Sequence, residues 1–284
     1  LLSRGAGVAQ LGHSLSAGEK DRRSYFLHPP LERNMHEDLA LCWRVEEACQ
    51  LAWPALHAQH LGGYILRFSG SNRSRRANSL NPLNGPRARG AHFVSLAEGV
   101  FDHFHMRACF RLPDIANELD VDLASLGYQR EAETITLFAS DLSKVQPDRD
   151  VYVAPNHVPA SWLDFYFSQS DEGESQRKTF QDMLGKIAMP CAFGQFTYGN
   201  EVAAIAYVVA VDGIAIIESV ATHPDFRRKG MAQKTINSLL AWTAKQGCTA
   251  AALQVVAENE PATTLYTKLG FSKELYRYHY RVKK

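Results

Sequence analysis

Three consecutive basic residues, Arg227 to Lys229, stand directly before Gly230, where an apolar strand pattern changes into a helical one. Backbone N–H groups at the start of a helix have no partner within the helix, and the helix dipole places partial positive charge there. A glycine lets the backbone approach a ligand closely, and the basic side chains add charge. This junction therefore predicts a site for a phosphate or pyrophosphate. The Walker pattern and the dinucleotide G-x-G-x-x-G pattern are both absent.

Two stretches of the second half match the signatures of one enzyme family in residue type and spacing. Arg227-x-x-Gly230-x-Ala232 resembles the R-x-x-G-x-G/A acyl-CoA motif of the GCN5-related N-acetyltransferase (GNAT) family, with Ala at the last position where Gly is commoner. The run from Asn259 to Phe271, with its Asn, its Tyr and its Leu-Gly-Phe, resembles the second signature of that family. The resemblance covers about residues 155–281.

The resemblance implies an α/β (α+β) fold, in which a mixed, mostly antiparallel, twisted sheet is flanked by helices, and it implies acetyl-CoA as the co-substrate. Backbone amides from Arg228 to Ala232 would hold the pyrophosphate of coenzyme A. The segment from Val220 to Thr222 would pair with the pantetheine arm as an added strand, and Asn259 would bond the pantetheine amide or the neighbouring loop. The implied cofactor-binding residues are Val220, Ala221, Thr222, Arg227, Arg228, Lys229, Gly230, Met231, Ala232 and Asn259.

The resemblance also implies that an acceptor amine attacks the acetyl carbonyl directly, without a covalent enzyme intermediate. A strand amide would stabilise the oxyanion, and Tyr266 would give a proton to the leaving thiolate. Glu218, two residues before Val220 on the same strand face, is the candidate base that frees the lone pair of the amine. The alternatives remain open: Glu218 as a partly buried hydrogen-bonding residue of the strand, and Tyr266 as a helix residue that packs on Leu269 or Phe271.

Hydrophobic spacing predicts the elements that position these residues. Turn dipeptides indicate strands on either side of Gly199-Asn200 and a third strand after Asp212-Gly213. The remaining elements of the second half are predicted as a helix after Gly230, a strand at Ala251 to Val256, a helix at Pro261 to Leu269 and a strand at Glu274 to Tyr280.

The first half resembles a diverged copy of the second. The intervals from Gly90 to Asn117 and on to Gly127 are 27 and 10 positions, close to the 29 and 11 between the corresponding residues of the second half. A helical stripe from Ile115 to Leu126 takes part in the shared order of strands and helices. The chain thus resembles a tandem arrangement, predicted as a disordered or non-native extension at 1–34, a diverged GNAT-like domain at 35–145 and a GNAT acetyltransferase domain at 146–284.

The corresponding phosphate loop of the first half, Arg87 to His92, keeps Arg and Gly but places a bulky His where close approach needs a small residue. We therefore expect the first half to be a structural partner that helps to shape the acceptor groove. The arginines of the polar stretch from Asn72 to Asn78 could contact an anionic substrate, but arginines in and beside a hairpin loop are usually solvated, and we expect these to be so. The pair His103 and His105 does not converge on one metal when it lies on a helix, so no metal site is predicted.

The composition is that of an ordinary globular protein: 284 residues, 45% hydrophobic, 21% charged and a formal net charge of +1. Near-neutral charge argues against a nucleic-acid partner, and the absence of a long apolar run argues against a membrane span. Five cysteines without a C-x-x-C pair form neither a disulfide framework nor a zinc ribbon. We expect a soluble, cytoplasmic protein.

The leading hypothesis is an N-acetyltransferase that moves an acetyl group from acetyl-CoA to an amine of a small molecule, an amino acid or a peptide. A non-catalytic acyl-CoA-binding sensor or scaffold is the alternative, which the presence of both Glu218 and Tyr266 disfavours. Transfer of an aminoacyl group from charged tRNA is weakened by the near-neutral charge. The sequence leaves the acceptor, the acyl chain length and the oligomeric state open.

Overall fold

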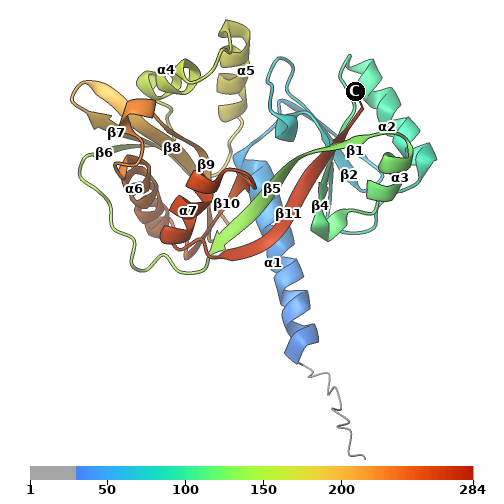
Figure 1. Ribbon diagram of the computed structural model, residues 1–284, viewed down its shortest axis with the longest axis horizontal. Helices are drawn as coiled ribbons and strands as arrows, with labels where there is room; N and C mark the ends of the chain where they lie inside the picture. The colour runs from blue at the N-terminus through green and yellow to red at the C-terminus, as the bar shows by residue number, and fades with distance from the viewer. Residues whose placement is uncertain (1–29, 284) are drawn as a thin grey trace, which may run out of the picture.

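The computed structural model describes residues 30–283, with side chains from residue 38 onward. Helices and strands alternate along the chain, and Figure 1 shows their arrangement. The helices are α1 (Pro30–Ala52), α2 (Ala91–His103), α3 (Asp120–Ser125), α4 (Ala160–Ser168), α5 (Glu174–Leu184), α6 (Met231–Lys245) and α7 (Glu260–Lys268), with 3-10 helices η1 (Arg75–Ala77), η2 (Asp114–Ala116) and η3 (Pro224–Phe226). The strands are β1 (His57–Leu61), β2 (Tyr64–Phe68), β3 (Leu80–Pro82), β4 (Cys109–Pro113), β5 (Gln129–Ala139), β6 (Val151–Pro155), β7 (Cys191–Tyr198), β8 (Glu201–Val211), β9 (Ile214–Thr222), β10 (Ala250–Val256) and β11 (Lys273–Val282).

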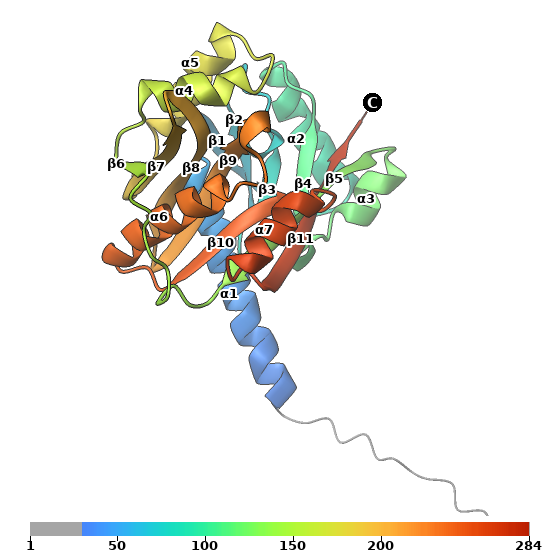
Figure 2. The ribbon, with the colours of Figure 1, turned by 60° about the vertical axis from the view of Figure 1, so that its left-hand side comes forward.

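All these strands join one 11-stranded sheet in the order β1-β2-β3-β4-β11-β5-β10-β9-β8-β7-β6. The pairs β3–β4 and β9–β10 are parallel, and the other neighbouring strands are antiparallel. Helices lie on both faces of the sheet, as the two views show (Figures 1 and 2). The predicted fold class, a mixed and mostly antiparallel sheet flanked by helices, is confirmed.

The two halves of the chain exchange strands at the centre of the sheet. β11, the last strand of the chain, pairs with β4 of the first half, and β5 of the first half pairs with β10 of the second. β5 and β11 also pair with each other and cross the middle of the molecule in Figure 1. The boundary predicted between residues 145 and 146 lies in the connector from β5 to β6 and stays a prediction. Residues 1–29 of the predicted extension lie outside the described residues.

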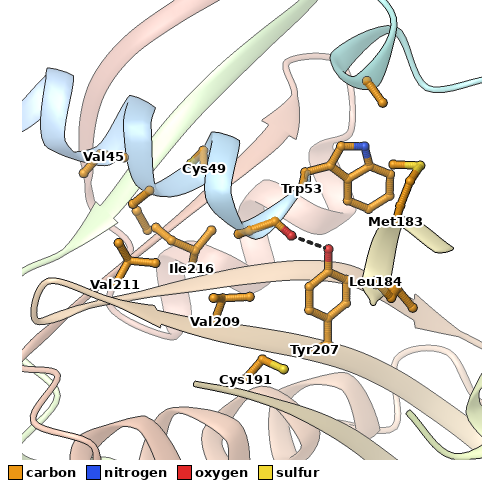
Figure 3. Close-up of a cluster of buried hydrophobic side chains, with 14 of the residues drawn as sticks. Val45, Cys49, Trp53, Met183, Leu184, Cys191, Tyr207, Val209, Val211 and Ile216 are labelled. Carbon is orange, nitrogen blue, oxygen red and sulfur yellow. Dashed lines mark hydrogen bonds between the residues drawn. The ribbon is translucent and has the colours of Figure 1, made fainter. Parts of the chain in front are cut away.

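In the second half, helices cover both faces of β8, and this explains its nearly continuous apolar sequence. Ile205, Tyr207 and Val209 belong to the core that includes α1, α4 and α5, whereas Ala206 and Val208 belong to the core under α6. Figure 3 shows the first of these cores, where α1 crosses the strands and the Tyr207 hydroxyl donates a hydrogen bond of 2.8 Å to the carbonyl oxygen of Ala52. This bond fixes the C-terminal end of α1 over the second half.

α6 comes unusually close to β7 at Gly194. A Cβ atom at this glycine would lie 2.9 Å from the Cγ atom of Leu239, so only glycine allows this approach. The middle of α6 is thereby fixed relative to the sheet beneath it. None of the helices within residues 30–283 is long and apolar enough to cross a membrane.

The first half has its own core, in which α2 and α3 pack on β2 and β4. The helical stripe predicted from Ile115 to Leu126 is wrong as one helix, because the chain forms η2 and then α3, with Asn117 between them at φ −110° and ψ 22°. β1 was not predicted: it precedes the turn at Gly62-Gly63 and pairs with β2, and most of it is exposed. A strand at the edge of a sheet needs no apolar alternation, and this is why the pattern missed it.

Candidate active site

Strands β9 and β10 diverge in the middle of the second half. Their parallel pairing ends at Ile217, opposite Leu253, although both strands continue. Just beyond, Ser219 adopts a left-handed conformation at φ 51°, and the register with β8 shifts between Ile205 and Tyr207. This β-bulge turns the last residues of β9 away from β10. A gap therefore opens within the sheet, and one backbone edge of β9 faces it.

A cavity of about 880 Å³ occupies this gap. Its walls come from the ends of β9 and β10, from the loop with η3, and from the first turns of α6 and α7. It is of the size that small-molecule and cofactor sites have. The predicted site residues that line it are Glu218, Val220, Ala221, Thr222, Arg227, Arg228, Gly230, Met231, Ala232, Asn259 and Tyr266. The structure thus brings together all but one of the residues predicted from the sequence.

Lys229 is the exception. It is exposed, it does not line the cavity, and its Nζ atom lies 5.3 Å from the ring centroid of Phe226. The neighbouring Arg227 and Arg228 are also exposed, but they border the cavity. Two of the three basic residues therefore add positive charge at its mouth.

The N-terminus of α6 opens on this cavity. Gly230 is the N-cap residue, with a left-handed φ of 79° and no side-chain hydrogen bond to the helix. The N–H groups of the first turn, from Met231 to Gln233, lack intrahelical acceptors. A left-handed φ favours glycine, which explains Gly230 in physical terms. These backbone donors, the helix dipole and the two bordering arginines make this end of the cavity suitable for an anion.

α7 supplies the opposite wall. The Oδ1 atom of Asn259 accepts a hydrogen bond of 3.2 Å from the N–H of Ala262 and so caps the helix. Tyr266 is buried, and its ring centroid lies 6.1 Å from that of Phe271 in an edge-on arrangement. Tyr266 therefore packs on Phe271, as the structural alternative for this residue predicted, and it also lines the cavity. Burial, with the charge of Glu218, raises the pKa of Tyr266 to about 12, so its hydroxyl holds a proton at neutral pH.

Glu218 lies at the inner part of the cavity and is only 5% exposed. Both its carboxylate oxygens accept hydrogen bonds from Arg76, at 2.7 Å from Nη1 and 2.8 Å from Nη2. Nη1 also donates to the Oε1 atom of Gln254 at 3.3 Å. Arg76 occupies both carboxylate oxygens, so the predicted role of Glu218 as base requires this pair to open.

Arg76 comes from η1 in the first half and was missed by the sequence reasoning. The expectation that it is solvated is wrong: its side chain is 21% exposed, and its guanidinium carbon lies 4.6 Å from the ring centroid of Trp53. Burial alone would lower its pKa, but the charge of Glu218 raises that pKa well above its ordinary value. No local pattern could find the contact, because the two residues are 142 positions apart in the chain. The N-terminal half therefore contributes a charged side chain to the cavity.

In the first half, the loop that corresponds to the phosphate-binding turn is filled by its own residues. The N–H of Gly90, at the start of α2, donates to the Oδ2 atom of Asp122 at 3.0 Å. Arg87 forms an ion pair with Glu118. The loop also packs tightly on the preceding hairpin, since a Cβ atom at Gly63 would lie 2.3 Å from the carbonyl oxygen of Pro86. Carboxylates of the chain thus occupy the positions that an anionic ligand would need.

No group of three or more His, Cys, Asp or Glu side chains in the described part of the chain could hold a metal ion. The Ser219 hydroxyl oxygen, which lies in the bulge at the cavity, is buried without a hydrogen-bond partner among these same residues. An orphaned buried polar atom beside a cavity is compatible with a ligand that supplies its partner.

Comparison with known proteins places the whole described fold in one family. The profile of the family described as "Probable histone acetyltransferase Rv0428c C-terminal" matches residues 42–281. The uncharacterized N-acetyltransferase YobR of Bacillus subtilis is 25% identical over 248 residues, which cover 85% of this chain and 98% of YobR. A GCN5-related N-acetyltransferase from Kribbella flavida has the same fold, with a TM-score of 0.59, 15% identity and coverage of 84% of this chain and 93% of that one. A tandem GNAT protein from the clavulanic acid biosynthesis pathway gives a TM-score of 0.56 and 11% identity, with coverage of 82% and 85%.

Proposed function

The chain belongs to the Rv0428c C-terminal family of GNAT-type acetyltransferases and is an acyltransferase, and we propose that it transfers an acetyl group from acetyl-CoA to the nitrogen of an amine acceptor. The acceptor would be a small molecule, an amino acid or a peptide. The observation that carries the proposal is the N-terminus of α6, whose backbone donors open on a cavity of about 880 Å³ that continues to Tyr266 and Glu218.

In this proposal, coenzyme A would lie along the cavity. The N–H groups from Arg228 to Ala232, with the charges of Arg227 and Arg228, would hold the pyrophosphate. The free edge of β9 from Val220 to Thr222 would pair with the amides of pantetheine as an added strand does. Asn259 lines the same channel beyond its helix-capping bond. The orphaned hydroxyl of Ser219 is a further polar group that a ligand in this channel could satisfy.

The reaction would proceed by direct transfer. An ammonium group of the acceptor loses a proton to the Glu218 carboxylate, and the freed nitrogen attacks the carbonyl carbon of the thioester. A carbon–nitrogen bond forms and the carbon–sulfur bond breaks. The thiolate takes the proton of Tyr266, and the phenolate takes the remaining excess proton of the new amide nitrogen. The products are the N-acetylated acceptor, coenzyme A and one proton on Glu218, which solvent removes.

The chemistry of the side chains supports these roles. The raised pKa of Tyr266, about 12, keeps it protonated until the thiolate forms. A backbone N–H at the divergence of β9 and β10 would stabilise the oxyanion, as preorganised donors do in acyl transfer. The five cysteines are all buried and free, and burial raises the pKa of each thiol. They therefore make poor nucleophiles, and reduced cysteines support the proposal that the enzyme works in the cytoplasm.

A calorimetric titration with acetyl-CoA, followed by measurement of released coenzyme A over a panel of amines, tests the proposal. We expect binding and at least one amine that releases coenzyme A. Absence of heat and of a thermal shift on addition of acetyl-CoA would refute it. Binding of acetyl-CoA with no transfer to any amine would instead support the sensor alternative.

A further inference from the structure

Several charged side chains lie in the interior where α1, η1 and β9 meet. Arg111 and Glu46 form a buried ion pair, in which the Tyr276 hydroxyl also donates to Glu46 at 2.6 Å. Arg76 and Glu218 form the second pair, at the cavity. In total, three guanidinium groups, those of Arg67, Arg76 and Arg111, share this interior with two carboxylates.

Arg67 is the guanidinium without a carboxylate partner among the described residues. It is 5% exposed and donates to the carbonyl oxygens of Trp53 and, at 3.3 Å, of Gln50, at the end of α1. Burial, with the charges of Arg76 and Arg111, lowers its pKa to about 10. The interior beside the cavity therefore carries an excess of positive charge, which the carbonyl groups at the helix end only partly offset.

This charge arrangement disfavours an acceptor that is simply a cation. A monoamine that bound to Glu218 would displace Arg76 and leave that guanidinium without an anionic partner in a mostly buried place. It would also add a positive charge to an interior that already has one in excess. An uncompensated charge in a protein interior is strongly destabilising, so this exchange is unfavourable.

We propose that the acceptor is a free α-amino acid, whose carboxylate binds Arg76 while its ammonium group binds Glu218. Such a zwitterion adds no net charge, and it replaces each partner of the existing ion pair with a group of the same sign. The guanidinium of Arg76 offers two parallel donors, the geometry that a carboxylate prefers. The proposal rests on the proposed acetyltransferase function and adds the substrate class.

The exchange also explains how Glu218 becomes available as a base. While Arg76 bonds both of its oxygens, the Glu218 carboxylate is not free to bind the ammonium group of an acceptor. Once the carboxylate of the substrate has taken Arg76, the only cation on Glu218 is the ammonium group that must lose a proton. Binding of the acceptor therefore frees Glu218 from Arg76. Arg76, a residue of the first half, binds the acceptor for the reaction that the second half catalyses.

Matched acceptors test this inference without any variant. The release of coenzyme A is measured for each standard L-amino acid, for its carboxamide, which keeps the α-amine but lacks the carboxylate, and for a dipeptide with the same N-terminal residue. We expect at least one free amino acid to be an acceptor, with kcat/KM at least 10-fold above that of its carboxamide and its dipeptide.

The Arg76→Lys variant locates the effect, with Arg75→Lys as its control. Lysine keeps the charge but loses the paired donors, so we expect kcat/KM for the amino acid to fall at least 10-fold more than kcat/KM for the carboxamide. Arg75 is the neighbouring residue of η1, it pairs with Glu131 at 2.8 Å, and it does not line the cavity. Its replacement should change neither value. Thermal unfolding and acetyl-CoA titration verify that both variants are folded.

Three results would overturn the inference: equal turnover of amino acids and their carboxamides, an equal loss for both substrates in Arg76→Lys, or transfer to peptides or monoamines with no free amino acid accepted. If Arg76→Lys does not fold, the comparison of acceptors with the unaltered enzyme still decides the matter. Failure of the unaltered enzyme to bind acetyl-CoA would refute the proposed function itself and this inference with it.

Discussion

Replacing Ala232 with proline removes one of the backbone donors that we propose for the pyrophosphate of coenzyme A. Ala232 is the second residue of α6, and the N-cap Gly230 supplies no side-chain substitute. Proline lacks the N–H group but is tolerated in the first turn of a helix. In this chain, Pro261 already occupies the second position of α7. The substitution therefore removes a donor and leaves the helix in place.

The expected loss follows from the strength of one such bond. A hydrogen bond to a charged group contributes about 1.5–3 kcal/mol, so acetyl-CoA should bind roughly 10- to 150-fold more weakly. Calorimetry at one fixed salt concentration measures the change in Kd. Ala232→Ser is the matched control, because it alters the same side chain but retains the N–H group, and its Kd should stay within about threefold of the original.

A folded Ala232→Pro variant that binds acetyl-CoA as tightly as the unaltered protein would refute this reasoning. Circular dichroism and the melting temperature establish that the variant is folded. Such a result would mean that the pyrophosphate lies elsewhere, and the roles proposed for the rest of the cavity would lose their reference point. If Ala232→Pro and Ala232→Ser weaken acetyl-CoA binding by the same factor, the reasoning is refuted as well. The effect would then come from the altered side chain and not from the lost N–H group.

Three further changes test other parts of the structure. Tyr266→Phe removes the proposed acid, so kcat should fall by roughly 100-fold or more with acetyl-CoA affinity retained; an unchanged kcat would exclude that role. Tyr207→Phe deletes the bond to Ala52 and should lower the free energy of unfolding in urea by about 0.5–1.5 kcal/mol; no loss would contradict that bond. Hydrogen bonds from Arg281 lower the pKa of Asp120 to about 2, so this carboxylate stabilises the fold above about pH 3.9 and loses that effect as the pH falls toward 2. Asp120→Asn should weaken the acid dependence of the denaturant midpoint between these values, and an identical pH profile would be the contrary outcome.

The parts of the site that depend on neighbouring residues in the sequence were predictable. The loop and the start of α6 follow one another directly in the chain, and Gly230 indicates the backbone conformation that the turn needs. The bulge was not predicted, because the serine at position 219 does not indicate a left-handed φ. Gly230 has the left-handed φ that its type allows, and the apolar stripe of α6 packs where its spacing indicates. For the same reason, the predicted site residues from Val220 to Ala232 line one cavity, apart from Lys229.

The parts that depend on distant residues were not predictable. The contact of Arg76 with Glu218 joins the two halves of the chain. An arginine in a polar loop has the same neighbours in the sequence whether its side chain is exposed to solvent or reaches into a cavity. The exchange of β5 and β11 was not predictable either. Each strand has an ordinary alternating pattern, which predicts a strand but not the strand with which it pairs. The first-half loop could be read only in part: its His92 disfavoured a ligand, but the carboxylate of Asp122 that fills the position came from a distant helix.

Because β11 lies between β4 and β5, the first half of the chain cannot complete its sheet before β11 has been synthesised. β4 and β5 leave a space of one strand between them, and β11, which is synthesised after the other ten strands of the sheet, fills it. We expect the N-terminal half to remain open to proteases until β11 has been synthesised. Pulse digestion of stalled chains that lack β11 would reveal this, and protection of that half in such chains would contradict it. The chain cannot be divided into two halves that each form a complete sheet. β11 of the second half lies beside β4 of the first, and β5 of the first half lies beside β10 of the second.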